Sequence, residues 1–142
     1  MRLSIPLAAF LLAAGLACGA RAQAIDPAGQ TCPAQAKSLA RLELFFGAKR
    51  AAGGVVTREE WEAFIDAQVT PLFPDGLTWF EGRGQWRGRD GVIVKEETRL
   101  LVVWAAPGDA TEAAIEAIRA AYRSMFDQES VMRVHGWSCV NF

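Results

Sequence analysis

The charged and titratable side chains that suit a polar ligand recur at alternate positions in three segments, which places them on one face of each expected strand. They are Arg41, Glu43, Lys95, Glu97, Arg99, Arg133 and His135. Four arginine and lysine residues against two acids leave a local positive excess, which would hold an anionic or polar molecule. His135 is the only histidine, so its ordinary pKa alone lies near neutrality, as a general acid or base requires.

A plainer interpretation is that these charges pair across neighbouring strands. Glu43 would then meet Arg133, and Arg41 would meet Glu97, each pair contributing about 0.2–1 kcal/mol. A second group of polar residues, secondary candidates for a ligand site or else ordinary solvated positions, consists of Gln85, Glu96 and Gln128.

The motifs that usually accompany a cofactor are missing from the sequence. It contains no phosphate-binding loop, dinucleotide fingerprint, zinc-binding helix motif or nucleophile elbow. Gly82-Arg83-Gly84 falls in a strand pattern that leads into a hairpin, whereas a dinucleotide loop leads into a helix. With one histidine and no two cysteines close together, we expect no metal and no cofactor. A Ser-His or Cys-His triad would have to use His135.

The first 24 residues have the three-part pattern of an export signal. Arg2 precedes an uncharged run rich in Leu and Ala over residues 3–20, and small residues mark a cleavage site that ends at Ala24. Retention as a membrane helix is one alternative, although the run is rich in Ala and Gly. The sequence thus predicts a periplasmic or secreted protein, with a lipoprotein attached at Cys18 as another alternative.

Cleavage after Ala24 leaves residues 25–142, the usual size of a single domain. Loss of two arginines with the signal leaves 13 basic against 16 acidic residues, so no basic excess points to a nucleic-acid partner. Two cysteines remain, Cys32 and Cys139. In an oxidising compartment such a pair predicts a disulfide in preference to two free thiols.

Periodicity in the first half of this domain predicts a strand and then a helix. Residues 38–47 alternate as a half-buried strand, with Leu42, Leu44 and Phe46 on its inner side. The run Thr57-Arg58-Glu59-Glu60 is a capping box that begins a helix, and the next proline ends it.

A hairpin, a second helix and a last strand are expected to follow. Residues 77–87 and 92–105 predict two strands joined by a turn at Asp90-Gly91, and two glycines in the first suggest a bulge. Asp109 would cap the second helix, and residues 130–140 predict the last strand. The apolar stripe expected on the second helix is Ile115, Ile118, Tyr122 and Met125.

The order strand, helix, strand, strand, helix, strand predicts the split βαβ, ferredoxin-like α+β fold, a four-stranded antiparallel sheet with two helices on one face. Its sheet order is 4-1-3-2, so the first and last strands are neighbours. This adjacency brings Cys32 close to Cys139. Trp61 and Tyr122 are in phase with their helices' apolar stripes and are expected in the core.

Helices on one side leave the other face of the sheet open. On that face we expect the seven charged and titratable residues together with Phe45, Leu101, Val103 and Trp137. These apolar side chains predict a homodimer that pairs through the open face.

The function expected from these features is a non-catalytic module of the cell envelope that binds a small ligand or a protein partner. The alternative is a small cofactor-independent enzyme whose site lies between the sheets of a dimeric α+β barrel. In that case Arg99 and His135 would converge on one pocket.

Several runs also carry a resemblance to a known family. They are Leu44-Phe45-Phe46-Gly47, Trp61 with Phe64, Val69-Thr70-Pro71, Phe73 through Thr78, Gly84-Gln85-Trp86, and Phe126 with Gln128-Glu129-Ser130-Val131. On these runs the sequence resembles the exported bacterial proteins grouped as domain of unknown function 3574. Where that family usually has Glu followed by Pro-Ser or a similar pair, this chain has Glu96 followed by Glu97-Thr98. The resemblance implies no particular activity.

Overall fold

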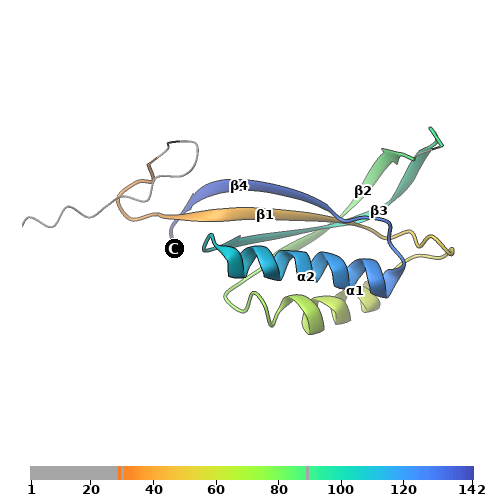
Figure 1. Ribbon diagram of the computed structural model, residues 1–142, viewed down its shortest axis with the longest axis horizontal. Helices are drawn as coiled ribbons and strands as arrows, with labels where there is room; N and C mark the ends of the chain where they lie inside the picture. Colours follow the sequence, from red (N-terminus) through yellow and green to blue (C-terminus); the bar gives the residue numbers. More distant parts are fainter. Residues whose placement is uncertain (1–28, 30, 89) are drawn as a thin grey trace, which may run out of the picture.

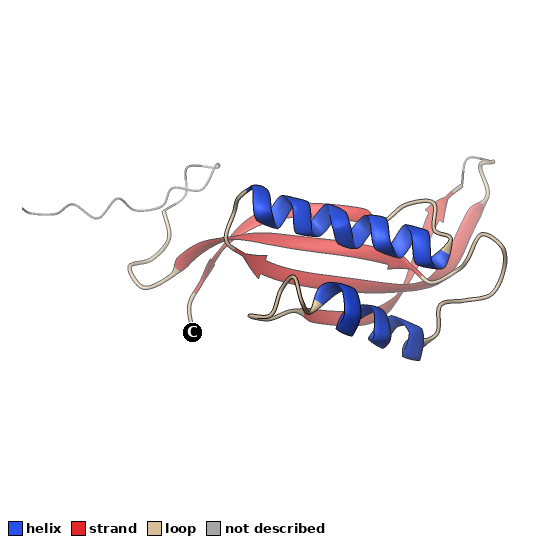
Figure 2. Cartoon of the chain, turned by 60° about the horizontal axis from the view of Figure 1, so that its bottom comes forward, coloured by secondary structure: helices blue, strands red, loops and turns tan. Residues whose placement is uncertain are grey.

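The computed structural model describes Gly29 and residues 31–88 and 90–142, and it shows a four-stranded antiparallel sheet with its helices on one face (Figures 1 and 2). The sheet order is β2-β3-β1-β4, so the predicted ferredoxin-like arrangement is confirmed. The expected export signal and the alternative lipid site at Cys18 lie outside the described residues. The elements are β1 (Lys37–Gly47), α1 (Arg58–Phe64), the π-helical turn η1 (Ile65–Val69), β2 (Thr78–Arg87), β3 (Ile93–Ala105), α2 (Asp109–Phe126) and β4 (Met132–Val140).

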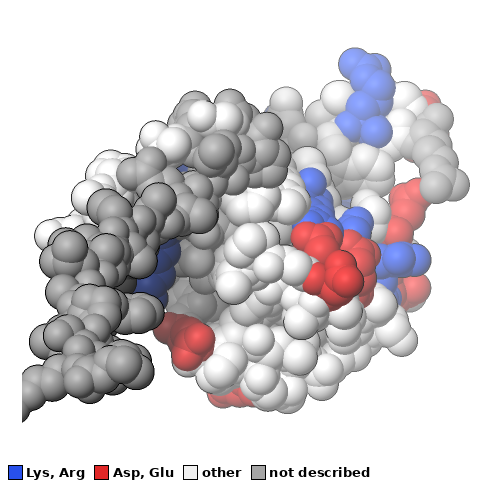
Figure 3. Space-filling view, turned by 60° about the vertical axis from the view of Figure 1, so that its left-hand side comes forward, with Lys and Arg blue, Asp and Glu red and all other residues white. Residues whose placement is uncertain are grey.

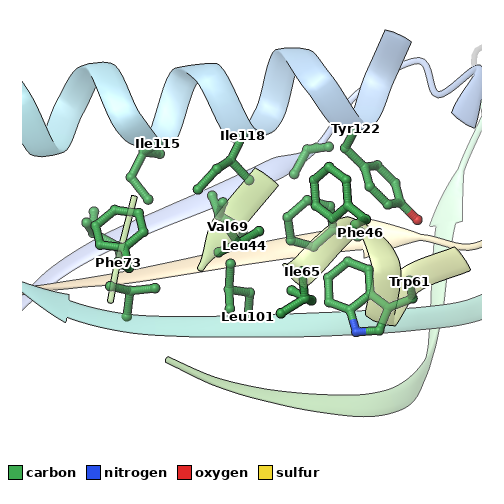
Figure 4. Close-up of a cluster of buried hydrophobic side chains, with 14 of the residues drawn as sticks. Leu44, Phe46, Trp61, Ile65, Val69, Phe73, Leu101, Ile115, Ile118 and Tyr122 are labelled. Carbon is green, nitrogen blue, oxygen red and sulfur yellow. The ribbon is translucent and has the colours of Figure 1, made fainter. Parts of the chain in front are cut away.

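The core lies between the sheet and the helices and includes the inner side of β1. Leu42, Leu44 and Phe46 are at most 1% exposed, as their alternation predicted. The Phe46 ring meets the rings of Trp61 and Tyr122 edge-on, with centroids 5.0 and 4.6 Å away (Figure 4). Such pairs contribute about 0.5–1.5 kcal/mol beyond the area they bury. The prediction that Trp61 and Tyr122 are core aromatics is confirmed.

The first helix begins where the capping box predicted. The Thr57 side chain accepts a hydrogen bond from the backbone N–H of Glu60, and the Glu60 carboxylate accepts one from the backbone N–H of Thr57 at 2.9 Å. This second bond, with another from Arg50, holds the pKa of Glu60 below its usual value. After α1 the helix continues as the wider π-helical turn η1 and ends before Pro71. Proline has no backbone N–H to donate the next helical hydrogen bond.

The second helix departs from the prediction at both ends. Its N-cap is Gly108, with no side-chain hydrogen bond, so the expected cap at Asp109 is wrong. Asp109 is already the first helical residue, where its charge interacts favourably with the helix dipole. The buried stripe ends at Phe126 and not at Met125, which is 53% exposed, because Phe126 packs against Tyr122 with centroids 4.8 Å apart.

The β2–β3 hairpin is regular, and the expected bulge is wrong. All ten residues of β2 pair with β3 without interruption, Gly82 and Gly84 included. The predicted turn is confirmed at Asp90-Gly91, where Gly91 has φ 81° and the Asp90 carboxylate accepts a hydrogen bond from the N–H of Val92.

Strand pairing shows which residues of β3 face the helices. Leu42 lies opposite Val103, and Leu44 lies opposite Leu101. These partners of the buried side of β1 are themselves at most 1% exposed. The second half of β3 is apolar at both sets of alternate positions, so alternation alone did not identify its inner face. The expectation that β3 turns the following residues to the open face is therefore wrong: Lys95, Glu97, Arg99, Leu101 and Val103.

The expected orientation of β4 is wrong as well. His135 pairs with Leu42 on the helix side of the sheet, and Arg133 and Trp137 share that side. The physical reason is visible at Arg133, whose guanidinium lies 2.8 Å from a carboxylate oxygen of Glu112 on α2. The sheet's open face carries Arg41, Glu43 and Phe45 of β1, as predicted. It also carries the residues that pair with these three in β3 and β4.

The predicted disulfide between Cys32 and Cys139 is present, with the two Cα atoms 5.4 Å apart. It joins the segment before β1 to the end of β4, where Ser38 pairs with Cys139. Among the described helices, none is long and apolar enough to cross a membrane.

Replacing both disulfide cysteines with Ser should lower the free energy of unfolding by about 2–4 kcal/mol, because a loop spanning 107 residues is no longer closed in the unfolded chain. Guanidinium titration followed by circular dichroism measures the change, and reduction of the unmodified protein should reproduce it. Two thiols that react freely with iodoacetamide in the native, oxidised protein would contradict the bridge.

Candidate functional site

Arg99 is a charged side chain in the aromatic core. It lies opposite Phe46 in the β1–β3 pairing and is only 3% exposed. Its Nη2 donates a hydrogen bond to the carbonyl oxygen of Val56 at 3.0 Å, and its guanidinium carbon lies 5.6 Å from the centroid of the Trp61 ring. A guanidinium has five N–H groups, and burial makes each unpaired one costly.

Hydrogen-bond donors without acceptors gather around Arg99. In the part of the chain that the structure describes, the buried side-chain nitrogens without a partner are Arg50 Nε, Trp61 Nε1, Arg99 Nε and Arg99 Nη1. Three of these atoms belong to the stacked pair of Arg99 and Trp61. Each such donor costs about 1–3 kcal/mol. Guanidinium N–H groups are frequent partners of carboxylate and phosphate groups.

Glu81 of β2 faces Arg99 across the hairpin. Its Oε1 lies 3.7 Å from Arg99 Nε, too far for a hydrogen bond. Its Oε2 instead accepts a hydrogen bond from Arg58, whose guanidinium lies over the Trp79 ring. One carboxylate is thus shared between two guanidinium groups, and Arg58 also lies 3.9 Å from Glu62 Oε1.

A groove runs from Arg99 outward along the hairpin. Its inner part, about 250 Å³, includes Arg99 and Glu81, and its outer part, about 780 Å³, lies between the hairpin and the loop after β1. The two parts share Arg83 and Glu97. Of the residues predicted from the sequence, the groove brings together Lys95, Glu97, Arg99, Gln85 and Glu96.

Glu96 fixes the loop that forms one wall of the outer groove. Its carboxylate accepts hydrogen bonds from the backbone N–H of Lys49 at 3.1 Å and from Trp86 Nε1 at 2.8 Å. Gly47 leaves the space for it, since a Cβ there would lie 2.7 Å from Glu96 Oε2. Gln128 Nε2 donates to the carbonyl oxygen of Lys49 at 2.9 Å. Glu96 and Gln128 therefore position this wall from two sides.

Burial shifts the pKa of one tyrosine in the core. Tyr122 donates a hydrogen bond to the Gly47 carbonyl oxygen, and burial raises the pKa of Tyr122 to about 12, so its hydroxyl stays protonated at neutral pH. The described residues include no group of three or more His, Cys, Asp or Glu that could hold a metal ion.

Four of the predicted ligand residues lie away from the groove. Arg41 pairs with Glu43 along β1 at 2.6 Å, and Arg133 pairs with Glu112 of α2, so the expected cross-strand pairs are wrong. His135 Nδ1 lies 3.3 Å from Arg133. His135 lies on β4 opposite Leu42, whereas Arg99 lies on β3 opposite Phe46, with β1 between the two strands, so His135 and Arg99 do not converge on one pocket. On the face drawn in Figure 3, basic and acidic side chains lie together in a mixed cluster.

Some groove residues were missed by the sequence reasoning. They are Lys49, Glu81 and Arg83, which line the groove, and Arg58, which binds Glu81. A usable signal was available for two of them, because the turn at Asp90-Gly91 fixes the hairpin register. That register places Glu81 opposite Arg99 and Arg83 opposite Glu97, so opposite charges alternate across the hairpin.

The fold and this groove define a ferredoxin-like α+β domain with a cluster of buried donors beside its hairpin. The chain belongs to the family described as protein of unknown function (DUF3574), whose model matches residues 41–142. A comparison with curated proteins finds no match.

Two solved structures are similar in fold. One is a phage SAM lyase in complex with S-methyl-5'-thioadenosine, at 16% identity and a TM-score of 0.57, covering 73% of this chain and 90% of that chain. The other is a phage SAM lyase in the apo state, at 14% identity and a TM-score of 0.56, covering 74% and 92%. At these identities the likeness shows a shared fold.

Replacing Arg99 with Met should change the free energy of unfolding by less than about 0.5 kcal/mol, because the lost hydrogen bond is offset by removal of a buried charge with unpaired donors. Arg119→Met is the matched control and should cost about 1–2 kcal/mol, since Arg119 donates to the Val131 carbonyl oxygen and to Glu116. Urea titration of both variants measures this. A larger loss for Arg99→Met than for Arg119→Met would contradict the view that Arg99 is poorly satisfied.

Proposed function

We propose that this protein is a binding module for a small anionic molecule, which it holds in the groove beside the β2–β3 hairpin, and that it works in the cell envelope. The ligand class is a carboxylate or phosphate. Its acceptor oxygens would meet the donors of Arg99 at the inner end of the groove.

The observation that carries the proposal is the buried cluster of unpaired donors. A charge in the core is seldom kept for stability, because an apolar side chain of similar volume is often as good or better. Residues that cost stability are commonly retained at functional sites. Arg99 is such a residue, because its charge lies in the core and two of its nitrogens are unpaired.

The size and charge of the groove agree with a small anion. Its outer part, about 780 Å³, lies within the usual range for small-molecule sites. Lys49, Arg83 and Lys95 line it together with Glu96 and Glu97. Three bases against two acids leave an excess of one positive charge, which would attract an anion from solvent.

Glu81 would act as an internal competitor for the same guanidinium. It already lies 3.7 Å from Arg99 and is bound by Arg58. A ligand anion would complete the hydrogen bonds of Arg99 while Glu81 stays with Arg58.

Calorimetric titration with inorganic phosphate, succinate and adenosine monophosphate tests the proposal. At least one probe should bind the unmodified protein, and Arg99→Met should weaken it by about tenfold or more, the effect of losing a charge-assisted hydrogen bond. Glu81→Gln should strengthen binding, because it removes the competing carboxylate.

The matched control is Arg133→Met, which removes an arginine that is paired with Glu112 at the other edge of the sheet. It should leave the affinity unchanged. If none of the probes binds at millimolar concentration, or if both arginine variants weaken binding equally, the groove is not an anion site.

An enzyme is the second candidate, favoured by the shared fold with a phage SAM lyase. S-adenosylmethionine carries a carboxylate that Arg99 would bind. Incubation with it and chromatography for S-methyl-5'-thioadenosine separates the two candidates. Product formed by the unmodified protein and lost in Arg99→Met would favour the enzyme, and binding without product would favour the module.

Location in the envelope is supported by the disulfide, which persists in oxidising compartments, and by the signal pattern of residues 1–24. Intact-mass measurement of the protein recovered from a bacterial envelope should show a chain that begins after Ala24. A mass that still includes Met1, or one that includes a lipid on Cys18, would contradict cleavage at this site.

A further inference from the structure

A row of apolar side chains crosses the open face of all four strands. Phe80 of β2 lies opposite Leu100 of β3, which lies opposite Phe45 of β1, which lies opposite Met132 of β4. Phe80 and Met132 are 56% and 55% exposed. Contiguous apolar surface of this kind usually marks an interaction site. It replaces the patch expected from the sequence, which included Leu101 and Val103, both now in the core.

A bare strip lies beside this row. Gly82 and Gly84 occupy the next open-face positions of β2, opposite Thr98 and Glu96. Neither has a positive φ, and a Cβ at either would lie 3.6–3.7 Å from Thr98, an ordinary contact. Nothing in the described part of the chain therefore requires glycine there, although glycine weakens a strand.

Gly47 makes a useful comparison within the same sheet. A Cβ there would clash with the Glu96 carboxylate at 2.7 Å, so an internal contact accounts for it. Gly82 and Gly84 have no such internal contact, and both also line the groove. Strand glycines without an internal cause often mark places where a ligand or another backbone approaches closely.

We infer that a second copy of this chain packs on the open face, with the apolar row of each copy seated in the glycine strip of the other. A two-fold interface requires a surface that is complementary to itself. A ridge that includes Phe80 and Phe45 beside a trough at Gly82 and Gly84 meets that requirement within one face.

Charge and area agree with a second copy. Arg41 and Glu43 neutralise each other at 2.6 Å on this face, so two copies would not repel one another there. Four strands and the 11 residues of β1 give a face of roughly 20 by 37 Å, or about 700 Å². A stable dimer buries about 800 Å² on each partner.

The hairpin extends this surface. Its far end projects beyond the other strands and away from the helices (Figure 1), toward the side that the second copy would occupy. Trp86, on the open-face side of β2 and 45% exposed, would lie at the margin of the interface.

Sedimentation analysis of three variants tests the inference. The unmodified protein should be a dimer at micromolar concentration. Phe80→Lys places a charge on the ridge, and Gly84→Val fills the trough, so each should raise the dimer dissociation constant by about 100-fold or more. Met125→Lys, which changes an apolar residue of similar exposure on α2, should leave it unchanged.

Circular dichroism separates dissociation from misfolding. Gly84→Val should keep or raise the thermal midpoint of the dissociated monomer, because valine favours a strand. An unmodified protein that is monomeric at high micromolar concentration would overturn the inference. So would variants Phe80→Lys and Gly84→Val that fold and still form the dimer as tightly as before.

Discussion

The placement of Arg99 in the aromatic core is the constraint on which the candidate site depends. From β3 it reaches the Val56 carbonyl oxygen before α1, the Trp61 ring on α1, and the neighbourhood of Glu81 on β2. One guanidinium thus connects the sheet to the first helix and to the hairpin. The donors that these contacts leave unpaired are the basis of the anion site that we propose.

Strand β3 separates two surfaces by its alternation. Arg99, Leu101 and Val103 point toward the helices, where they complete the core and the inner end of the groove. Leu100 and Val102 point to the open face. Leu100 belongs to the apolar row there, and Val102 lies between Glu43 and Thr78. A strand that is apolar on both sides serves this double role, and the two surfaces meet at Gly82 and Gly84, which line the groove and lie beside the apolar row.

The fold could be predicted from the sequence because its local signals agree with one another. The capping box at Thr57 and the Asp90-Gly91 turn each act over a few residues. The Cys32–Cys139 bridge then agrees with the topology that those elements imply. The capping box and the turn depend only on residues close in the sequence, and they favour the same fold as the bridge.

The site was predicted only in part, because its inner face depends on long-range pairing. Arg99 looks like a solvent-facing residue in sequence, and only its partner Phe46 shows that it is buried. The same error placed His135 on the open face, although its partner Leu42 is in the core. Glu81 was missed because its importance comes from facing Arg99, and a strand pattern read alone does not reveal a cross-strand partner.

The most direct test of the central claim is an NMR titration that follows the side-chain Nε–Hε resonances of the arginines as inorganic phosphate, succinate or adenosine monophosphate is added. The Arg99 resonance should move and saturate, because its Nε has no partner in the free protein. The Arg119 resonance should stay in place, because its Nε already donates to Val131. An Arg99 resonance that does not move with any of these anions, or arginines that all shift in parallel, would contradict the account.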